Sequence, residues 1–184
     1  MTLFNAAPLP VATLDDAQRL ACLRLIRSDN VGPVTFRELI NIYGGAVAAL
    51  EALPDLARRG GRARFRVASR EEAERELERA ARVGARPVFT IEPGYPPALA
   101  AIDTPPPLVY VKGDIALMSR PAVAIVGSRE ASAAGYKLTR IFTEALAAAG
   151  YVVVSGLARG IDAIAHGSSL ASGPVAVVAG GVDV

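Results

Sequence analysis

Two short loops rich in small residues are the clearest candidates for chemistry, because each carries one arginine. The first loop, Gly-Ser-Arg at residues 127–129, follows the apolar run at residues 123–126. The second, residues 155–162, follows the apolar run at residues 151–154. Each loop leads toward a segment with helical spacing, and a helix N-terminus presents free N–H groups and partial positive charge. Two neighbouring anion sites, each with an arginine, suit a ligand with more than one phosphate.

Strands and helices that must position these loops are readable from the hydrophobic pattern. A continuous apolar run at residues 123–126, between Pro121 and Gly127, predicts a strand buried on both faces. Ser132 is placed to cap a helix that ends at Gly150. The inner face of that helix is predicted to consist of Leu138, Ile141, Phe142, Ala145, Leu146 and Ala149. Further strands are expected at residues 151–154 and 175–178, with a short helix over residues 163–171 between them.

This order, strand-loop-helix repeated, predicts an α/β fold: a Rossmann-like parallel sheet with helices on both faces, preceded by a small all-α domain. In an open parallel sheet the loops after the strands lie along one edge, where ligands bind. Both arginine loops should therefore meet there. The expected phosphate-binding residues are Gly127, Ser128, Arg129, Ser155, Gly156, Arg159 and Gly160, with Lys137 as a third cation.

The two commonest nucleotide-binding motifs are missing from these loops. The dinucleotide motif G-x-G-x-x-G would need a glycine at Arg129, and no Gly-Lys-Ser/Thr phosphate loop is present. A structural alternative for the arginines is a salt bridge, with Glu130 or Asp162 as partner. The corresponding alternative for Lys137 is a solvated surface lysine.

The residues of this region resemble the DNA processing protein A (DprA/Smf) family. The resemblance rests on VAIVGSR at 123–129, VVVSGLARGIDA at 152–163, and the lead-in YPPAL at 95–99 with PPPLVYVKGD at 105–114. It implies a protein that is not an enzyme and has no cofactor. Such a protein binds single-stranded DNA without sequence preference during natural transformation. It also implies loading of the recombinase RecA onto that DNA and dimerisation through the α/β domain.

Two other functions remain open at this point. One is a nucleotide-binding hydrolase of the lysine-decarboxylase-like (phosphoribohydrolase) group, although its Pro-Gly-Gly-x-Gly-Thr loop is not in these residues. The other is an interaction module that uses the α/β core as a scaffold. Strong salt dependence of nucleic-acid binding would favour single-stranded DNA binding over both of these alternatives.

A catalytic set is not expected. The only histidine, His166, follows Asp162 at i,i+4 spacing, so the pair could hydrogen-bond on one helix face. A Ser-His-Asp arrangement with Ser128 or Ser155 is formally possible, but a structural Asp–His tie is the more economical interpretation. One histidine, one cysteine and scattered acids give no metal cluster, and Cys22 is expected in a helical core.

The N-terminal part is predicted to be a helix-hairpin-helix or SAM-like bundle. A helix begins at Asp15-Asp16, a Val-Gly-Pro turn at residues 31–33 opens a second helix, and a third covers residues 46–53. Such hairpins can hold a nucleic-acid backbone, but Pro33 removes an N–H that would donate to phosphate. A packed bundle or docking module is therefore preferred over direct DNA contact.

Residues 54–66 are expected to form a charged, glycine-containing connector whose arginines are a run of cations without acids, and which either contacts DNA backbone or is a solvated linker. Its arginines are Arg58, Arg59, Arg62, Arg64 and Arg66. Ser69 and Glu72 form a capping box for a helix whose exposed Glu and Arg residues predict a solvated, salt-bridged face. The domain boundary is placed near Arg86, giving domains 1–86 and 87–184. Short strands near residues 88–90 and 108–111 are expected to extend the parallel sheet at one edge.

Composition limits the choice of partners. Formal net charge over the 184 residues is only +2, so a nucleic-acid footprint would have to be local. No run approaches the roughly 18 apolar residues of a membrane span, and no signal-peptide pattern is present. We therefore expect a cytoplasmic protein without a membrane partner. The chain ends soon after its third expected core strand, which indicates the N-terminal part of a larger protein.

Overall fold

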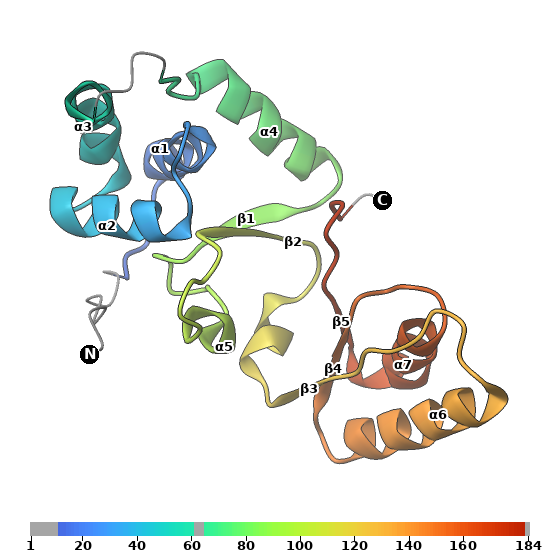
Figure 1. Ribbon diagram of the computed structural model, residues 1–184. Helices are drawn as coiled ribbons and strands as arrows, with labels where there is room; N and C mark the ends of the chain where they lie inside the picture. The colour runs from blue at the N-terminus through green and yellow to red at the C-terminus, as the bar shows by residue number, and fades with distance from the viewer. Residues whose placement is uncertain (1–10, 61–64, 183–184) are drawn as a thin grey trace, which may run out of the picture. The chain divides into compact units, whose positions relative to one another are not determined.

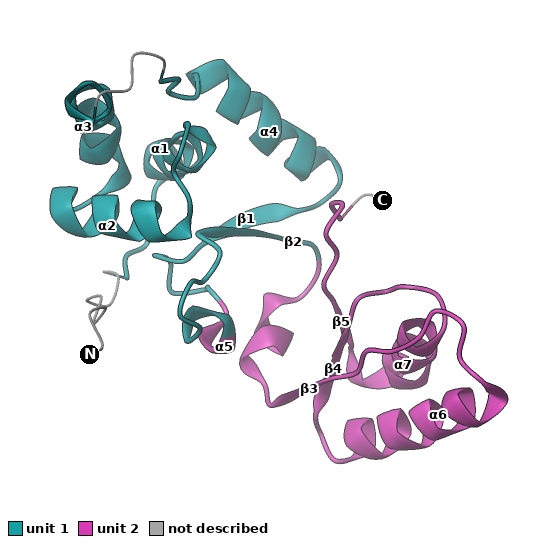
Figure 2. Ribbon diagram, in the orientation of Figure 1, with its two compact units in different colours: residues 1–95, 99–112 teal, residues 96–98, 113–184 magenta. Residues whose placement is uncertain are grey.

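A computed structural model of the chain describes residues 11–60 and 65–182. The chain divides into two compact units (Figure 2). Unit 1 comprises residues 1–95 and 99–112, and unit 2 comprises residues 96–98 and 113–184. Each unit has its own sheet, so the two are described separately.

Four helices make up most of unit 1 (Figure 1). They are α1 (Asp16–Arg27), α2 (Pro33–Tyr43), α3 (Ala46–Arg59) and α4 (Arg70–Arg82). Capping boxes begin two of them: Asp15 with Gln18 at α1, and Ser69 with Glu72 at α4. In each box two of the helix's unpaired N–H groups find side-chain acceptors, which confirms the predicted helix starts.

A hydrophobic core between these helices holds unit 1 together. Its most deeply buried large side chains include Leu23, Leu25, Phe36, Ile40 and Phe89. Helix α1 packs against α2, α3 and α4. The single cysteine, Cys22, is also part of this core, as predicted, and burial raises the pKa of its thiol to about 12.

Helix α3 continues beyond its predicted end. The predicted helix ended at Leu53, yet the helix runs through Pro54 to Arg59. An interior proline loses one backbone hydrogen bond and costs about 3 kcal/mol. Leu53 and Ala57, on either side of Pro54 in the chain, are both buried, so the helix keeps a packed face across the proline.

A separate two-stranded sheet also belongs to unit 1. Strand β1 (Arg86–Phe89) pairs antiparallel with β2 (Leu108–Val111), and α5 (Pro97–Ala100) lies between them in the chain. The expectation that these strands extend the parallel sheet is therefore wrong. Phe89 and Ile91 belong to the helical core instead, and Leu108 packs against it. The domain boundary expected near Arg86 consequently falls inside unit 1.

Unit 2 contains the predicted parallel sheet. Its strands are β3 (Ala122–Ala124), β4 (Val152–Ser155) and β5 (Val175–Ala176), in the order β3-β4-β5. Its helices are α6 (Ala133–Ala148) and α7 (Ile161–Ser169), and its two 3-10 turns are η1 (Ile115–Ser119) and η2 (Leu170–Ser172). Val153 of β4 lies opposite Val123 of β3, and Val154 lies opposite Val175 of β5. The strand-helix-strand-helix-strand order is confirmed.

Whereas the sequence predicted helices on both faces, both crossover helices lie on one face of this sheet. Sequential strand order with right-handed crossovers requires this, and α6 and α7 pack against each other and against β4 (Figure 1). The burial of the strands is uneven because helices α6 and α7 cover only one face of the sheet. Val152 and Val153 of β4 are buried, whereas Val126, just after β3, is 75% exposed. The prediction that the first strand is buried on both faces is therefore wrong within the described residues.

Helix α6 turns a different face inward from the one predicted. Ser132 caps it by accepting a hydrogen bond from the Gly135 N–H, as expected. However, Thr139 and Thr143 are the buried residues of the helix, and Phe142 is 61% exposed. Small and β-branched positions at i,i+4 spacing allow the close approach of α6 to α7 and β4. The larger apolar side chains Leu138, Ile141 and Phe142 are exposed instead.

The helices of the described residues are short, and α6, at 16 residues, is the longest. None of the helices in this part of the chain is long and apolar enough to cross a membrane, which takes about 20 residues.

Glu92 provides a test of the unit 1 fold. Its carboxylate is almost fully buried and accepts hydrogen bonds from the Arg19 guanidinium (2.8 and 2.9 Å) and from the Phe89 N–H (3.1 Å). Glu92→Ala would leave the buried Phe89 N–H unsatisfied, and we expect it to lower the free energy of unfolding by about 2–4 kcal/mol. Urea unfolding followed by circular dichroism measures this. Glu51→Ala, at an exposed helix position, should change stability by less than about 0.5 kcal/mol, and equal effects of the two variants would contradict the assignment.

Candidate nucleic-acid interface

The two arginine loops of unit 2 lie in direct contact. They follow β3 and β4, which are neighbouring parallel strands, so both emerge at the same sheet edge. The Ile161 N–H donates a hydrogen bond to the Ser128 carbonyl oxygen across the loops, with an N···O distance of 3.1 Å. This confirms the prediction that the loops share one side of the sheet.

Two glycines permit this close contact. Gly160 has a φ of +84°, and a Cβ there would lie 2.2 Å from the Ser128 carbonyl oxygen. A Cβ on Gly127 would lie 2.7 Å from Cγ1 of Ile161. Real Cβ atoms do not approach other atoms so closely, and left-handed φ favours glycine. The glycines therefore act by letting two backbone segments meet, a role that the spacing alone did not reveal.

Polar groups of the second loop hold its own conformation. The Ser155 hydroxyl, 3% exposed, donates to the Ile125 carbonyl oxygen (2.7 Å), which ties β4 to the end of β3. The Gly156 N–H donates to Oδ2 of Asp162 at 3.2 Å. Both groups thus have protein partners here, and their assignment as phosphate ligands stays a prediction.

Cations at this edge are available to a ligand. Arg129, Arg159 and Lys137 are all exposed. None of the three has a hydrogen-bond or ion-pair partner within residues 11–60 and 65–182. The alternative in which Glu130 or Asp162 pairs with an arginine therefore has no support in the described structure. Ser128 Oγ accepts a hydrogen bond from the Glu130 N–H (3.1 Å), so its own hydroxyl proton remains available for a ligand oxygen.

Asp162 and His166 do not form the expected tie. Both side chains are buried on α7, but Asp162 accepts from the Gly156 N–H, while Nε2 of His166 has no partner in the described part of the chain. Ser128 and Ser155 are engaged with backbone groups, so the described geometry aligns neither serine with His166. The same described residues contain no group of three His, Cys, Asp or Glu side chains that could hold a metal ion.

The arginine connector of unit 1 differs from its prediction. Arg58 and Arg59 lie in the last turn of α3, and Arg58 pairs with Asp55. Arg66 forms a two-bond ion pair with Glu72 (2.9 and 3.0 Å). The prediction of cations without acids is therefore wrong at Arg58 and Arg66. Arg62 and Arg64 lie outside the described residues.

Comparison with models of protein families identifies the family to which this chain is similar. The family model of DNA recombination-mediator protein A matches residues 86–184, which is more than half of the chain and contains both arginine loops. The chain belongs to this family. The model of the DprA-like N-terminal HHH domain matches residues 16–80, which cover the four helices of unit 1.

Individual relatives agree with that family. DNA processing protein DprA from Streptococcus pneumoniae is 41% identical over 101 residues, covering 53% of this chain and 36% of the relative. DNA processing protein DprA from Bacillus subtilis is 40% identical over 90 residues, covering 47% and 30%. Protein Smf from Escherichia coli is 42% identical over 76 residues, covering 41% and 20%. The matched part of the chain thus corresponds to about a fifth to a third of these relatives.

A solved structure shows the same architecture. The X-ray structure of DNA processing protein A from Streptococcus pneumoniae has a TM-score of 0.56 and 27% sequence identity with this chain. The match covers 79% of this chain and 48% of the solved one. A helical N-terminal region followed by a Rossmann-like parallel sheet is therefore the fold of this family member, as predicted.

Gly160→Ala tests the contact between the loops. The added Cβ would collide with the Ser128 carbonyl and would sit at a left-handed φ, so we expect a loss of at least about 2 kcal/mol in the free energy of unfolding of unit 2. Gly167→Ala is the matched control, because Gly167 lies in α7 and a Cβ there would meet nothing within 4 Å. That helical substitution should stabilise by about 0.5–1 kcal/mol. Urea unfolding of both variants measures these changes in the free energy of unfolding. An unchanged value for Gly160→Ala would contradict the contact between the loops.

Proposed function

We propose that this chain binds single-stranded DNA without sequence preference in natural transformation and recombination, through a phosphate cradle on unit 2. The cradle consists of Gly127, Ser128, Arg129, Ser155, Gly156, Arg159, Gly160 and Lys137. Its two arginines and its lysine bind backbone phosphates. The role is one of binding in the cytoplasm, without catalysis or a cofactor.

The observation that carries this proposal is the pair of unpaired arginines at one sheet edge. Arg129 and Arg159 belong to loops in direct contact, and neither has an ion-pair partner among the described residues. Guanidinium groups bind phosphate oxygens through charge-assisted, often two-bond contacts. Contacts to phosphate oxygens carry no sequence information, so binding through them is indifferent to sequence.

Family membership supports DNA as the ligand. The matching model is named for recombination mediation, and relatives in Streptococcus pneumoniae and Bacillus subtilis are named DNA processing proteins. We further propose that the whole protein loads the recombinase RecA onto the bound strand and acts as a homodimer through the α/β unit. A phosphoribohydrolase has no comparable support, since no described feature supplies its Pro-Gly-Gly-x-Gly-Thr loop.

Fluorescence anisotropy of a labelled oligo-dT strand against the full chain, across a salt series, tests the proposal. We expect binding with a steep negative salt slope. Arg129→Ala should weaken binding about ten-fold and reduce the slope by about 0.7, the contribution of one phosphate contact on a single strand. Strands of oligo-dA and oligo-dT should bind within a few-fold of each other.

Arg140→Ala is the control for general loss of charge. Arg140 is exposed on α6, beyond the loops, and its removal takes away the same single charge. If Arg140→Ala weakens binding as much as Arg129→Ala, the cradle is not the contact. Absence of oligo-dT binding at low salt would show the proposed function to be wrong, and turnover of a nucleoside monophosphate would favour the hydrolase.

A further inference from the structure

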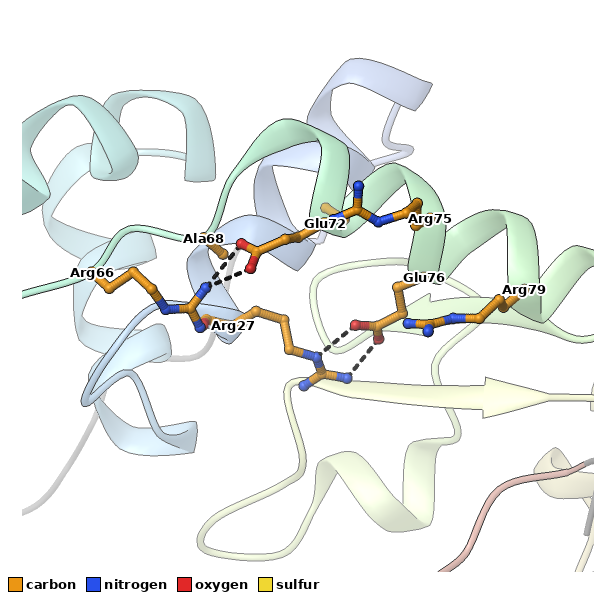
Figure 3. Close-up of a pocket in the computed structure, with 8 residues that line it drawn as sticks. Arg27, Arg66, Ala68, Glu72, Arg75, Glu76 and Arg79 are labelled. Atoms are coloured by element: carbon orange, nitrogen blue, oxygen red, sulfur yellow. Dashed lines mark hydrogen bonds and ion pairs between the residues drawn. The ribbon is translucent and has the colours of Figure 1, made fainter.

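A second group of arginines lies in unit 1, around a pocket of about 310 Å³ beside α4. Four arginines line it, from three places in the chain (Figure 3). Arg27 is the last residue of α1, Arg66 precedes α4, and Arg75 and Arg79 stand one turn apart on α4. The remaining lining residues are Ala68, Glu72, Ala73 and Glu76. Six of the eight lining residues are therefore charged, and the other two are alanines.

Two of these arginines are already paired and fixed. Arg27 donates to both carboxylate oxygens of Glu76 (2.7 and 2.9 Å), and Arg66 donates to both oxygens of Glu72. Burial alone would raise the pKa of Glu76, but hydrogen bonds from Arg27 and the Tyr110 hydroxyl hold it below its ordinary value. Both acids of the lining are thus neutralised by partners that also fix their orientation.

The other two arginines are left without partners. Arg75 and Arg79 make no hydrogen bond or ion pair with any described residue, and Figure 3 draws no interaction for either. The exposed face of α4 was expected to be salt-bridged along the helix, yet among the described residues only Arg70 and Glu74 form an ion pair within it. Glu72 and Glu76 form their ion pairs with arginines outside the helix. With four arginines and two acids, the described lining carries a formal excess of two positive charges, and the charges of Arg75 and Arg79 also help to lower the pKa values of Glu72 and Glu76.

This arrangement matches one class of ligand. Two guanidinium groups one turn apart can hold a tetrahedral anion between them, each offering a planar fork of N–H donors. A positively charged pocket of this size has room for a phosphodiester and part of a sugar.

We propose that this arginine pocket binds a phosphate of a nucleic-acid backbone through Arg75 and Arg79, as a second contact site separate from the cradle on unit 2. The inference rests on the proposed function for the identity of the strand. It gives the helical unit a direct part in strand binding, which the missing N–H at Pro33 had argued against for the hairpin turn. The site lies on α4 and its neighbours, outside that turn.

The experiment compares the full chain with the Arg75→Gln/Arg79→Gln double variant in oligo-dT anisotropy across a salt series. Glutamine keeps the helix propensity and removes only the charges. We expect about ten-fold weaker binding and a salt slope smaller by about 0.7, the share of one phosphate on a single strand. Arg140→Gln, at an exposed position in α6 outside both the pocket and the cradle, should leave both quantities unchanged. Equal losses in the double variant and in Arg140→Gln, or no loss in either, would overturn the proposal.

Glu72→Gln tests the same pocket in the opposite direction. Glutamine at this position retains the capping box with Ser69 and releases Arg66 from its ion pair. An additional free cation should tighten oligo-dT binding and steepen the salt slope. Weaker binding by this variant would contradict a phosphate site beside α4.

Failure of the pocket and failure of the proposed function give different results. If the unaltered chain does not bind oligo-dT at low salt, the proposed function is wrong. The pocket is then judged by titrating the thymidine dinucleotide pTpT into 15N-labelled protein and following the arginine Nε–Hε resonances. Shifts at Arg75 and Arg79, with the resonance of Arg140 unshifted, support phosphate binding there, and unshifted Arg75 and Arg79 resonances overturn it.

Discussion

The contact between two backbone segments, at Ser128 and Ile161, is the constraint on which the candidate interface depends. The hydrogen bond between them closes only because Gly160 has no Cβ where the Ser128 carbonyl lies. Parallel pairing of β3 with β4 brings the loops to one edge of the sheet. The absence of a Cβ atom at Gly127 and at Gly160 then allows the loops to contact each other. Without this approach Arg129 and Arg159 would be two isolated surface cations. With it they belong to two loops in contact at one edge of the sheet.

Local patterns predicted what local physics determines. Helix starts at Ser69 and Ser132 followed from capping chemistry, and the start at Asp15-Asp16 followed from acids in the first turn. The order of strands and helices in unit 2 followed from apolar runs separated by small-residue loops. The arginine loops were also found in this way, because a strand end followed by Gly, Ser and Arg has few structural explanations.

The errors arose where a residue's environment depends on a distant partner. Counting apolar residues assigned the large side chains of α6 to its inner face, but Thr139 and Thr143 are buried there because close helix packing selects small side chains. Strands β1 and β2 have the pattern of any short strand, and only the core around Phe89 decides that they pair with each other. The prediction of ion pairs along α4 holds at Arg70 and Glu74 but not at Glu76, whose partner is Arg27, 49 residues away.

Hydrogen bonds within the second loop affect the conformational entropy that is lost when a ligand binds at this edge of the sheet. Because Ser155 and Gly156 already have partners, this loop has little backbone freedom left to lose. For the proposed cradle, the entropy lost on binding would then lie mainly in the long side chains of Arg129, Arg159 and Lys137, at about 0.5–1.5 kcal/mol for each one immobilised. Side-chain ordering, rather than loop folding, would be the main conformational cost of binding there.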